Sequence, residues 1–342
     1  MEKYSFLNDY SEGAHPAILK ALSESNFQQM EGYGNDVIAE ETKTILHQKM
    51  NQNSSEIFFV SGGTQANLII ISSALRPHES VISVDTGHIT LREAGAIEAT
   101  GHKINVVEST NGKITKELIL PVLKEHDFGP HVVKPKMIYI SNSTEVGTIY
   151  TKKELEELYA FAKENKMYLF LDGARLGAAL TASDNDLTLE DVAKNTDVFT
   201  IGGTKNGALL GEVIVVNNEK LQEDFPFHIK QKGAMLSKGR LLSTQFRELF
   251  KDDLYFTLAK HANKMAEKLT KAILDQGYKM LADSTTNQIF PILPKELIQK
   301  LEKDFIFYRW KEIDENNIAL RIVTSWATKE EKVEEFIEKL KP

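Results

Sequence analysis

The sequence predicts an α/β fold with a mainly parallel sheet in a large domain, followed by a small α+β domain. Between residues 55 and 216, short apolar runs rich in β-branched residues alternate with helix-like segments. Strands buried on both faces between two layers of helices have this composition. After about residue 234 the alternation ends, and a long helical stretch precedes short strand-like pieces. The strands expected in the large domain are residues 56–60, 80–84, 103–107, 137–140, 167–171, 197–201 and 212–216.

The helices are predicted from the spacing of apolar residues. Residues 151–162 place them three and four apart, and Thr151 with Glu154 forms a capping box at the start. We expect a large α/β domain over residues 1–240 and a small α+β domain over residues 241–342. The elements expected in the small domain are a bridging helix over residues 241–275, strands at 288–293, 305–308 and 318–323, and a closing helix from Lys329.

The composition excludes several classes of protein. Among 342 residues, 49 are Asp or Glu and 41 are Lys or Arg, whereas nucleic-acid binding needs a concentrated basic face. The chain has no cysteine, which excludes disulfides, thiolate zinc sites and cysteine nucleophiles. No segment approaches the roughly 20 apolar residues that cross a bilayer, and residues 1–10 lack a signal-peptide pattern. We expect a cytoplasmic protein without a metal site that binds neither nucleic acid nor membrane.

Three segments that follow expected strands carry unusual sequences, and ligands in such sheets bind beyond the carboxyl ends of strands. The first is residues 60–67 (VSGGTQAN), where Gly62 and Gly63 allow a tight turn into a helix. The free N–H groups and positive dipole end of that helix suit an anion such as a phosphate, and Thr64 adds a hydroxyl donor. The segment is neither a Walker loop nor a dinucleotide fingerprint. Taken alone, such a junction is structural more often than not.

The second and third segments supply a carboxylate and an amine. Asp172 ends an apolar strand, where a carboxylate is costly without a partner. That partner is either Arg175, three residues on, or a protonated pyridine nitrogen. Lys205 lies just past another buried strand, between glycines that let it reach into a cleft. Most lysines are solvated surface charges, but partial desolvation here would lower the pKa of Lys205 and favour a Schiff base.

The order of these segments predicts a site for pyridoxal 5'-phosphate (PLP). A phosphate loop, then an aspartate, then a lysine on a later strand provide a phosphate anchor, a partner for the pyridine nitrogen and a partner for the aldehyde. The chain also resembles the threonine aldolase and β-eliminating lyase family, which are PLP enzymes of aspartate aminotransferase-like architecture (fold type I). The matching segments run from residues 7–9 (LND) and 32–34 (GYG) through 87–96 (GHITLREAGA), 172–175 (DGAR) and 202–205 (GGTK) to 321–326 (RIVTSW).

The resemblance implies roles for the residues that match the cofactor site. Lys205 is expected to form the Schiff base and Asp172 to hold the pyridine nitrogen. Gly62, Gly63 and Thr64 are expected to hold the phosphate. His88 is expected to stack on the cofactor ring, close to the β-substituent of the substrate. Without the resemblance, a lone histidine after a buried strand would more often be a hydrogen-bonded structural residue.

The resemblance also implies how a substrate and a second subunit take part. Arg175 and Arg321 are expected to hold the α-carboxylate of the substrate, with Asn8 near it, since guanidinium groups bind carboxylates bidentately. Tyr33 is expected to reach an active site across the interface of a homodimer or homotetramer. One cation of residues 230–240 (KQKGAMLSKGR), namely Lys232, Lys238 or Arg240, is expected to reach the neighbouring subunit's phosphate.

The expected activity is cleavage of L-threonine, L-allo-threonine and related β-hydroxy-α-amino acids to glycine and an aldehyde. Many family members carry a second histidine where residues 141–147 read SNSTEVG, so the base for the β-hydroxyl is open, with Thr144 or Glu145 in that neighbourhood. Two alternatives remain. One is β-elimination on the same scaffold with another amino acid. The other is a non-catalytic homologue, which the combined presence of Lys205, Asp172, Arg175 and Arg321 disfavours.

Overall fold

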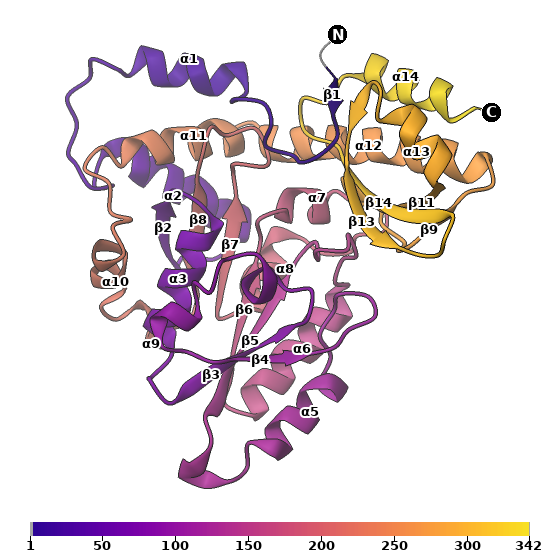
Figure 1. Ribbon diagram of the computed structural model, residues 1–342. Coiled ribbons are helices and arrows are strands. Elements are labelled where there is room, and N and C mark those ends of the chain that lie inside the picture. Colours follow the sequence, from indigo (N-terminus) through magenta and orange to yellow (C-terminus); the bar gives the residue numbers. More distant parts are fainter. Residues whose placement is uncertain (1–2, 342) are drawn as a thin grey trace.

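The computed structural model describes residues 3–341 and contains a large central sheet flanked by helices, with a smaller sheet beside it (Figure 1). The order of the seven-stranded sheet is β2-β8-β7-β6-β5-β3-β4, and only β8 runs antiparallel to its neighbours. The predicted α/β fold with a mainly parallel sheet is confirmed. The strands are β2 (Glu56–Val60), β3 (Glu79–Val84), β4 (Ile104–Val107), β5 (Lys134–Ser141), β6 (Tyr168–Asp172), β7 (Val198–Gly202) and β8 (Glu212–Val216).

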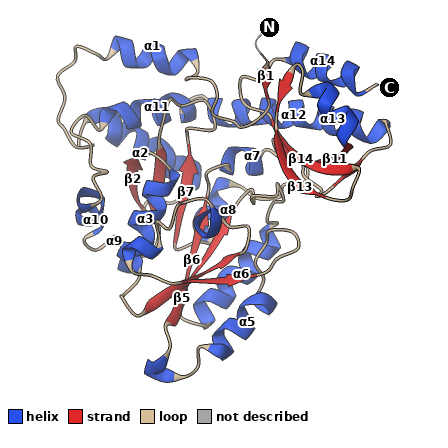
Figure 2. Ribbon diagram, in the orientation of Figure 1, coloured by secondary structure: helices blue, strands red, loops and turns tan. Residues whose placement is uncertain are grey.

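Helices cover both faces of this sheet, as Figure 2 shows. Alternate residues of a strand point to opposite faces, so Leu169 and Leu171 of β6 pack in one apolar cluster and Phe170 in another. The helices of this part of the chain are α1 (Pro16–Glu24), α2 (Val37–Met50), α3 (Gly63–Ala74), α4 (His88–Leu91), α5 (Lys116–Glu125), α6 (Lys152–Glu164), α7 (Leu176–Leu180), α8 (Leu189–Lys194), α9 (Glu219–Gln222), α10 (Phe225–Gln231) and α11 (Arg240–Phe250).

The second sheet is antiparallel and is built from carboxyl-terminal residues. Its order is β10-β14-β11-β9, and β13 also pairs with β14. The amino-terminal strand β1 (Tyr4–Ser5) pairs in parallel with β12 (Phe305–Ile306), so the first segment of the chain lies against the carboxyl-terminal part. The remaining elements are α12 (Leu254–Asp275), β9 (Lys279–Met280), β10 (Gln288–Ile289), β11 (Pro291–Pro294), α13 (Lys295–Leu301), β13 (Tyr308–Glu312), β14 (Asn317–Val323) and α14 (Glu330–Leu340).

The local predictions are mostly confirmed, with one clear error. The capping box of Thr151 and Glu154 is formed at the start of α6. The single helix expected over residues 241–275 is wrong, because the chain breaks between α11 and α12 with Asp253 in the left-handed region at φ 57°. The apolar spacing continues across this break without a glycine or proline, and aspartate tolerates the left-handed conformation better than most residues. The domain boundary at residue 240 stays a prediction.

Six strands of the large sheet run in one direction, because β8 is antiparallel to both β2 and β7. The carboxyl ends of β2, β5, β6 and β7 therefore lie along one edge, where the three segments singled out above begin. Within residues 3–341, no helix is both long and apolar enough to span a membrane.

Candidate active site

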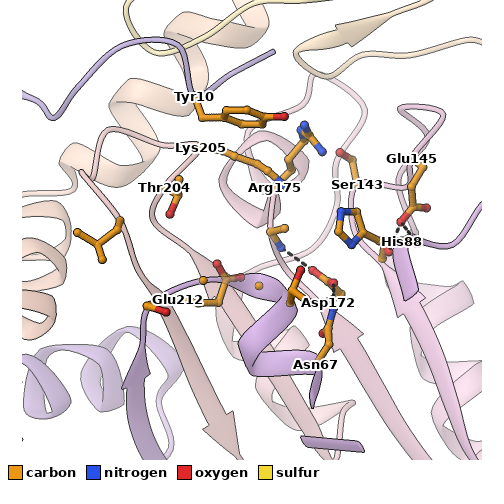
Figure 3. A pocket seen from close by; sticks show the side chains of 17 residues that line it. Tyr10, Asn67, His88, Ser143, Glu145, Asp172, Arg175, Thr204, Lys205 and Glu212 are labelled. Atoms are coloured by element: carbon orange, nitrogen blue, oxygen red, sulfur yellow. Dashed lines mark hydrogen bonds between the residues drawn. The ribbon is translucent and has the colours of Figure 1, made fainter. Parts of the chain in front are cut away.

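A cavity of about 380 Å³ opens at the carboxyl edge of the parallel strands (Figure 3). A second hollow of similar volume adjoins it and shares part of its wall, so the two form an inner and an outer part of one cleft. The residues that line both parts are Tyr10, His88, Glu145, Arg175 and Lys205.

Asp172 is the last residue of β6 and lies buried in the inner wall. Its Oδ2 accepts hydrogen bonds from the Tyr139 hydroxyl at 2.6 Å and from Asn67 Nδ2 at 3.2 Å. Its Oδ1 accepts one from the backbone N–H of Ala174 at 2.9 Å. Burial, together with the charge of Asp172, raises the pKa of Tyr139 well above its ordinary value, so the hydroxyl stays a donor. These donors fix the direction of the carboxylate.

Two backbone segments approach closely and set the positions of Asp172 and Lys205. The N–H of Gly202 donates to the carbonyl oxygen of Gly173 at 3.0 Å. A β-carbon at Gly173 would lie 1.9 Å from the carbonyl oxygen of Thr200, and one at Gly202 would lie 2.4 Å from another carbonyl oxygen. Glycine is therefore required by packing at both positions.

Lys205 lines both parts of the cleft, and Figure 3 shows its side chain below Tyr10 and directed toward Arg175. Burial, together with the positive charge of Arg175, lowers the pKa of Lys205. A lowered pKa increases the fraction of neutral amine, which is the form that attacks a carbonyl carbon.

The start of α3 forms another part of the inner wall, through Gly62, Gly63 and Thr64. Gly62 is the N-cap, and no side chain caps the first N–H groups of the helix. A β-carbon on Gly62 or Gly63 would meet no atom within 4 Å, so open space lies beside this turn. Unpaired backbone N–H groups at a helix start are suited to a phosphate.

Arg175 pairs with Asp9, so the alternative that Arg175 is the partner of Asp172 is wrong. Nε and Nη2 of Arg175 donate to the two oxygens of Asp9 at 2.7 and 2.9 Å. Asn287 Nδ2 donates to Asp9 Oδ2 at 2.9 Å. Burial opposes the ionisation of Asp9, but the charges of Arg175 and Lys205 outweigh it and hold the pKa of Asp9 below its usual value. The pair fixes the guanidinium in the wall of the cleft.

Arg321 lines the outer part of the cleft together with Tyr308 and Trp310. Its Nε and Nη2 donate to the amide oxygen of Gln288 at 3.1 and 2.6 Å. Burial and the nearby charge of Arg175 lower the pKa of Arg321 to about 10, so it is still a cation at neutral pH. Two guanidinium groups thus lie in the walls of one cleft, as their predicted role requires.

His88 begins α4 and lines both parts of the cleft. Its Nδ1 lies 2.8 Å from Glu93 Oε1, an oxygen that also accepts from Asn67 Nδ2 at 2.7 Å. The backbone N–H of His88 donates to Glu145 Oε1 at 3.0 Å, and the hydroxyl of Ser141 donates to the same oxygen at 2.7 Å. Burial raises the pKa of Glu145. Because Glu93 engages Nδ1, Nε2 is the ring nitrogen left for a ligand.

Two predicted substrate residues lie outside the cleft of their own chain. Asn8 Oδ1 accepts from the backbone N–H of Tyr10 and from the Ser11 hydroxyl, both at 3.0 Å, and so holds a turn. Tyr33 is 52 % exposed, and the amino group of Lys230 lies 4.9 Å from its ring centre. Their expected roles stay predictions. The three cations expected to reach a neighbouring subunit, which also do not line this cleft, are Lys232, Lys238 and Arg240.

Several residues of the cleft were not found by the sequence reasoning. Glu212 opens the apolar strand β8, and an acid at the start of a buried strand is a signal similar to Asp172 at the end of one. Tyr10 and Asp9 come from a loop distant in sequence. Asp9 lies in the matching segment 7–9, but no role was predicted for it, and no local pattern marks Tyr10. Of Thr144 and Glu145, only Glu145 lines the cleft within the described part of the chain.

Comparison with known proteins agrees with this geometry. Residues 7–295 match the family model described as β-eliminating lyase. A low specificity L-threonine aldolase from a Pseudomonas species is 32 % identical over 98 % of this chain and 96 % of that protein. A solved threonine aldolase from Leishmania major has a TM-score of 0.97 and 45 % identity, covering 99 % of this chain and 98 % of that one. An aspartate aminotransferase from Thermus thermophilus has a TM-score of 0.73 at 15 % identity, over 99 % of this chain and 91 % of that one.

The fold and the cleft therefore define the fold type I class, whose architecture is that of aspartate aminotransferase. Within that class, the chain belongs to the threonine aldolase and β-eliminating lyase family.

The Asp9–Arg175 pair gives a prediction about stability. Replacing Asp9 with Ala leaves Arg175 buried without its counter-charge, so we expect a loss of about 3–5 kcal/mol in the free energy of unfolding. Urea unfolding of the apoprotein measures it. The control is the double variant Asp9→Ala/Arg175→Met, which should lose less than the sum of the two single variants. Additive losses would mean that the two side chains do not stabilise one another.

Proposed function

We propose that this protein is a PLP-dependent aldehyde-lyase that cleaves L-threonine, L-allo-threonine and related β-hydroxy-α-amino acids to glycine and an aldehyde. The observation that carries the proposal is that Lys205, Asp172 and the start of α3 line one cavity of about 380 Å³. The relatives named as threonine aldolases support the choice of reaction.

The donors and acceptors of the inner cavity fit PLP. Lys205 would hold the aldehyde carbon, Asp172 the pyridine nitrogen, and Gly63 and Thr64, next to Gly62, the phosphate. When bound there, PLP supplies an electron sink for the electron pair of the broken Cα–Cβ bond. The carboxylate of Asp172, held by three hydrogen bonds, is positioned to keep a proton on the pyridine nitrogen.

The outer part of the cleft would orient the amino-acid substrate. Arg175 and Arg321 would hold the α-carboxylate, and Asp9 keeps the guanidinium of Arg175 in one orientation. Fixing the carboxylate fixes the direction of the Cα–Cβ bond, and such positioning lowers the entropic part of the barrier. His88 Nε2, directly or through a water molecule, would take the proton of the β-hydroxyl. Glu145, which holds the backbone of His88, is a second candidate for this base.

The active unit would be a homodimer or homotetramer in the cytoplasm, with active sites at the subunit interface. Tyr33 would reach the neighbouring active site. Asn8, which accepts from the backbone N–H of Tyr10 in the cleft wall, would act near the substrate carboxylate through that turn. The exposure of Tyr33, which lies away from the cleft of its own chain, supports this assignment. One of Lys232, Lys238 and Arg240 would meet the neighbouring phosphate.

Product analysis tests the proposed reaction. The purified protein with PLP should release acetaldehyde and glycine in equal amounts from L-threonine and L-allo-threonine, and benzaldehyde from phenylserine. An amino acid with a β-leaving group serves as the comparison, because β-elimination would release ammonia and a keto acid. Formation of the keto acid without aldehyde would replace the proposed reaction with this alternative.

Lys205 is expected to carry the covalent attachment of the cofactor. The Lys205→Ala variant should lack the visible absorption of the protein-bound imine and lose threonine cleavage by more than about 1000-fold, because the nucleophilic amine is gone. Lys153→Ala is a matched control at an exposed lysine of α6. A Lys205→Ala protein that kept both the colour and the turnover would contradict the assignment.

Asp172 is expected to act on the electronic state of the cofactor more than on its retention. For Asp172→Asn we expect bound PLP but a fall in kcat of at least about 100-fold, since a neutral amide cannot stabilise the protonated pyridine nitrogen. Absorbance measures cofactor content, and aldehyde release measures kcat. Near-normal turnover would show that this carboxylate does not serve the ring nitrogen.

A further inference from the structure

Glu212 is a buried acid in the cofactor cavity to which the proposed reaction gives no task. It is 3 % exposed and is the first residue of β8, paired with Val60 of β2 on one side and with Gly202 of β7 on the other. Because β2 continues directly into Gly62 and Gly63, the carboxyl group lies beside the start of α3. Figure 3 shows it in the cavity wall, between Thr204 and Asp172.

The hydrogen bonding of Glu212 differs from that of Asp172. Asp172 accepts from three donors, whereas Glu212 Oε1 is buried without a hydrogen-bond partner among residues 3–341. The Thr200 hydroxyl favours the ionised form of Glu212 through a hydrogen bond. A buried carboxylate with so few donors is costly, but a carboxylic acid with an O–H to donate suits an acceptor in the cavity.

The charges that face Glu212 come from three elements. Burial, together with the negative charge of Asp172 on β6, raises the pKa of Glu212 to about 8, and Lys205 after β7 opposes this rise. Tyr255 on α12 lies close enough for its own pKa to be raised by burial and by Glu212. From β2 and α3, the cavity wall next to Glu212 presents only uncharged residues. The surroundings of Glu212 therefore favour its protonated form.

We infer, resting on the proposed cofactor, that Glu212 is a protonated carboxylic acid that donates a hydrogen bond to the phosphate group held at the start of α3. The N–H groups of that helix supply donors from one side, and the acid supplies one from β8 on the other. The ionised form of Glu212 could not donate and would repel the phosphate dianion. Glu212 thus couples the retention of the phosphate to pH, without taking part in the cleavage of the substrate.

The test compares PLP with pyridoxal, which lacks the phosphate, as ligands of the apoprotein. Both need Lys205, so the ratio of their dissociation constants isolates the contribution of the phosphate. The ratio is measured by absorbance titration from pH 7 to 9.5 in the wild type, in Glu212→Gln and in Glu212→Leu. A phosphate monoester has its second pKa near 6 and is a dianion throughout this range.

In the wild type, the ratio of the dissociation constant of pyridoxal to that of PLP should fall at least about tenfold between pH 7 and 9.5, because the acid ionises as the pH passes about 8. Glu212→Gln keeps a neutral donor of similar shape, so its ratio should match the wild type at pH 7 within about threefold and stay constant to pH 9.5. Glu212→Leu has no donor and should bind PLP about tenfold or more weakly than Glu212→Gln at pH 7, with pyridoxal unaffected.

The unfolding of the apoprotein gives a readout without cofactor. The pKa of Glu212 is raised in the folded state, so the folded protein holds more protons between the ordinary glutamate pKa of 4.5 and about 8. Stability from this group is therefore present at low pH and is lost as the pH rises through that window. Glu212→Gln should melt several degrees above the wild type at pH 9 and close to it at pH 5.

Two results would overturn the inference. A ratio in the wild type that follows Glu212→Gln at every pH would show that the acid does not act on the phosphate. A Glu212→Gln protein that binds PLP much more tightly than the wild type at pH 7 would show that Glu212 is already ionised there, for example beside a cation of a neighbouring subunit. If PLP binds and L-threonine is cleaved but the ratios do not move, the proposed function stands and the role of Glu212 alone fails. If the wild type binds no PLP, both fail.

Discussion

The close backbone approach between the ends of β6 and β7 is the constraint on which the cleft depends. Gly173 and Gly202 lie in contact, and neither has space for a β-carbon. Gly173 directly follows Asp172 at the end of β6, and Gly202 ends β7 three residues before Lys205. The separation of Asp172 and Lys205 is therefore set by the backbone. Functional groups held by strand ends are positioned more accurately than groups held by long loops.

The charges in the cleft are arranged in two ways. Arg175 shares its charge with Asp9 through two hydrogen bonds, so that pair is locally neutral. Arg321 faces the neutral amide of Gln288 and keeps its charge for a ligand. A substrate carboxylate would thus gain most of its electrostatic attraction from Arg321, while Arg175 provides a fixed direction.

The strands and much of the site could be predicted from sequence because their signals are local. Short β-branched runs marked all seven strands of the large sheet, and Asp172 and Lys205 were found because each follows such a run. The break at Asp253 was missed because no glycine or proline marks it in the sequence. The two helices are separated by packing, since α11 and α12 contact different neighbouring elements. The partner of Arg175 was also missed, since Asp9 is 166 residues away in sequence and only the fold brings it near.

The pairing of β1 with β12 has a practical consequence for work with this protein. The backbone of Phe6 donates to Ile306 and accepts from Val323, which ties the first segment to the carboxyl-terminal sheet three residues before Asp9. Asp9 then reaches across to Arg175 in the cleft. Deleting the amino-terminal residues would therefore remove the hydrogen bonds that connect the small sheet, through residues 6–9, to Arg175 in the cleft. Such a deletion could lower turnover even where the protein still folds.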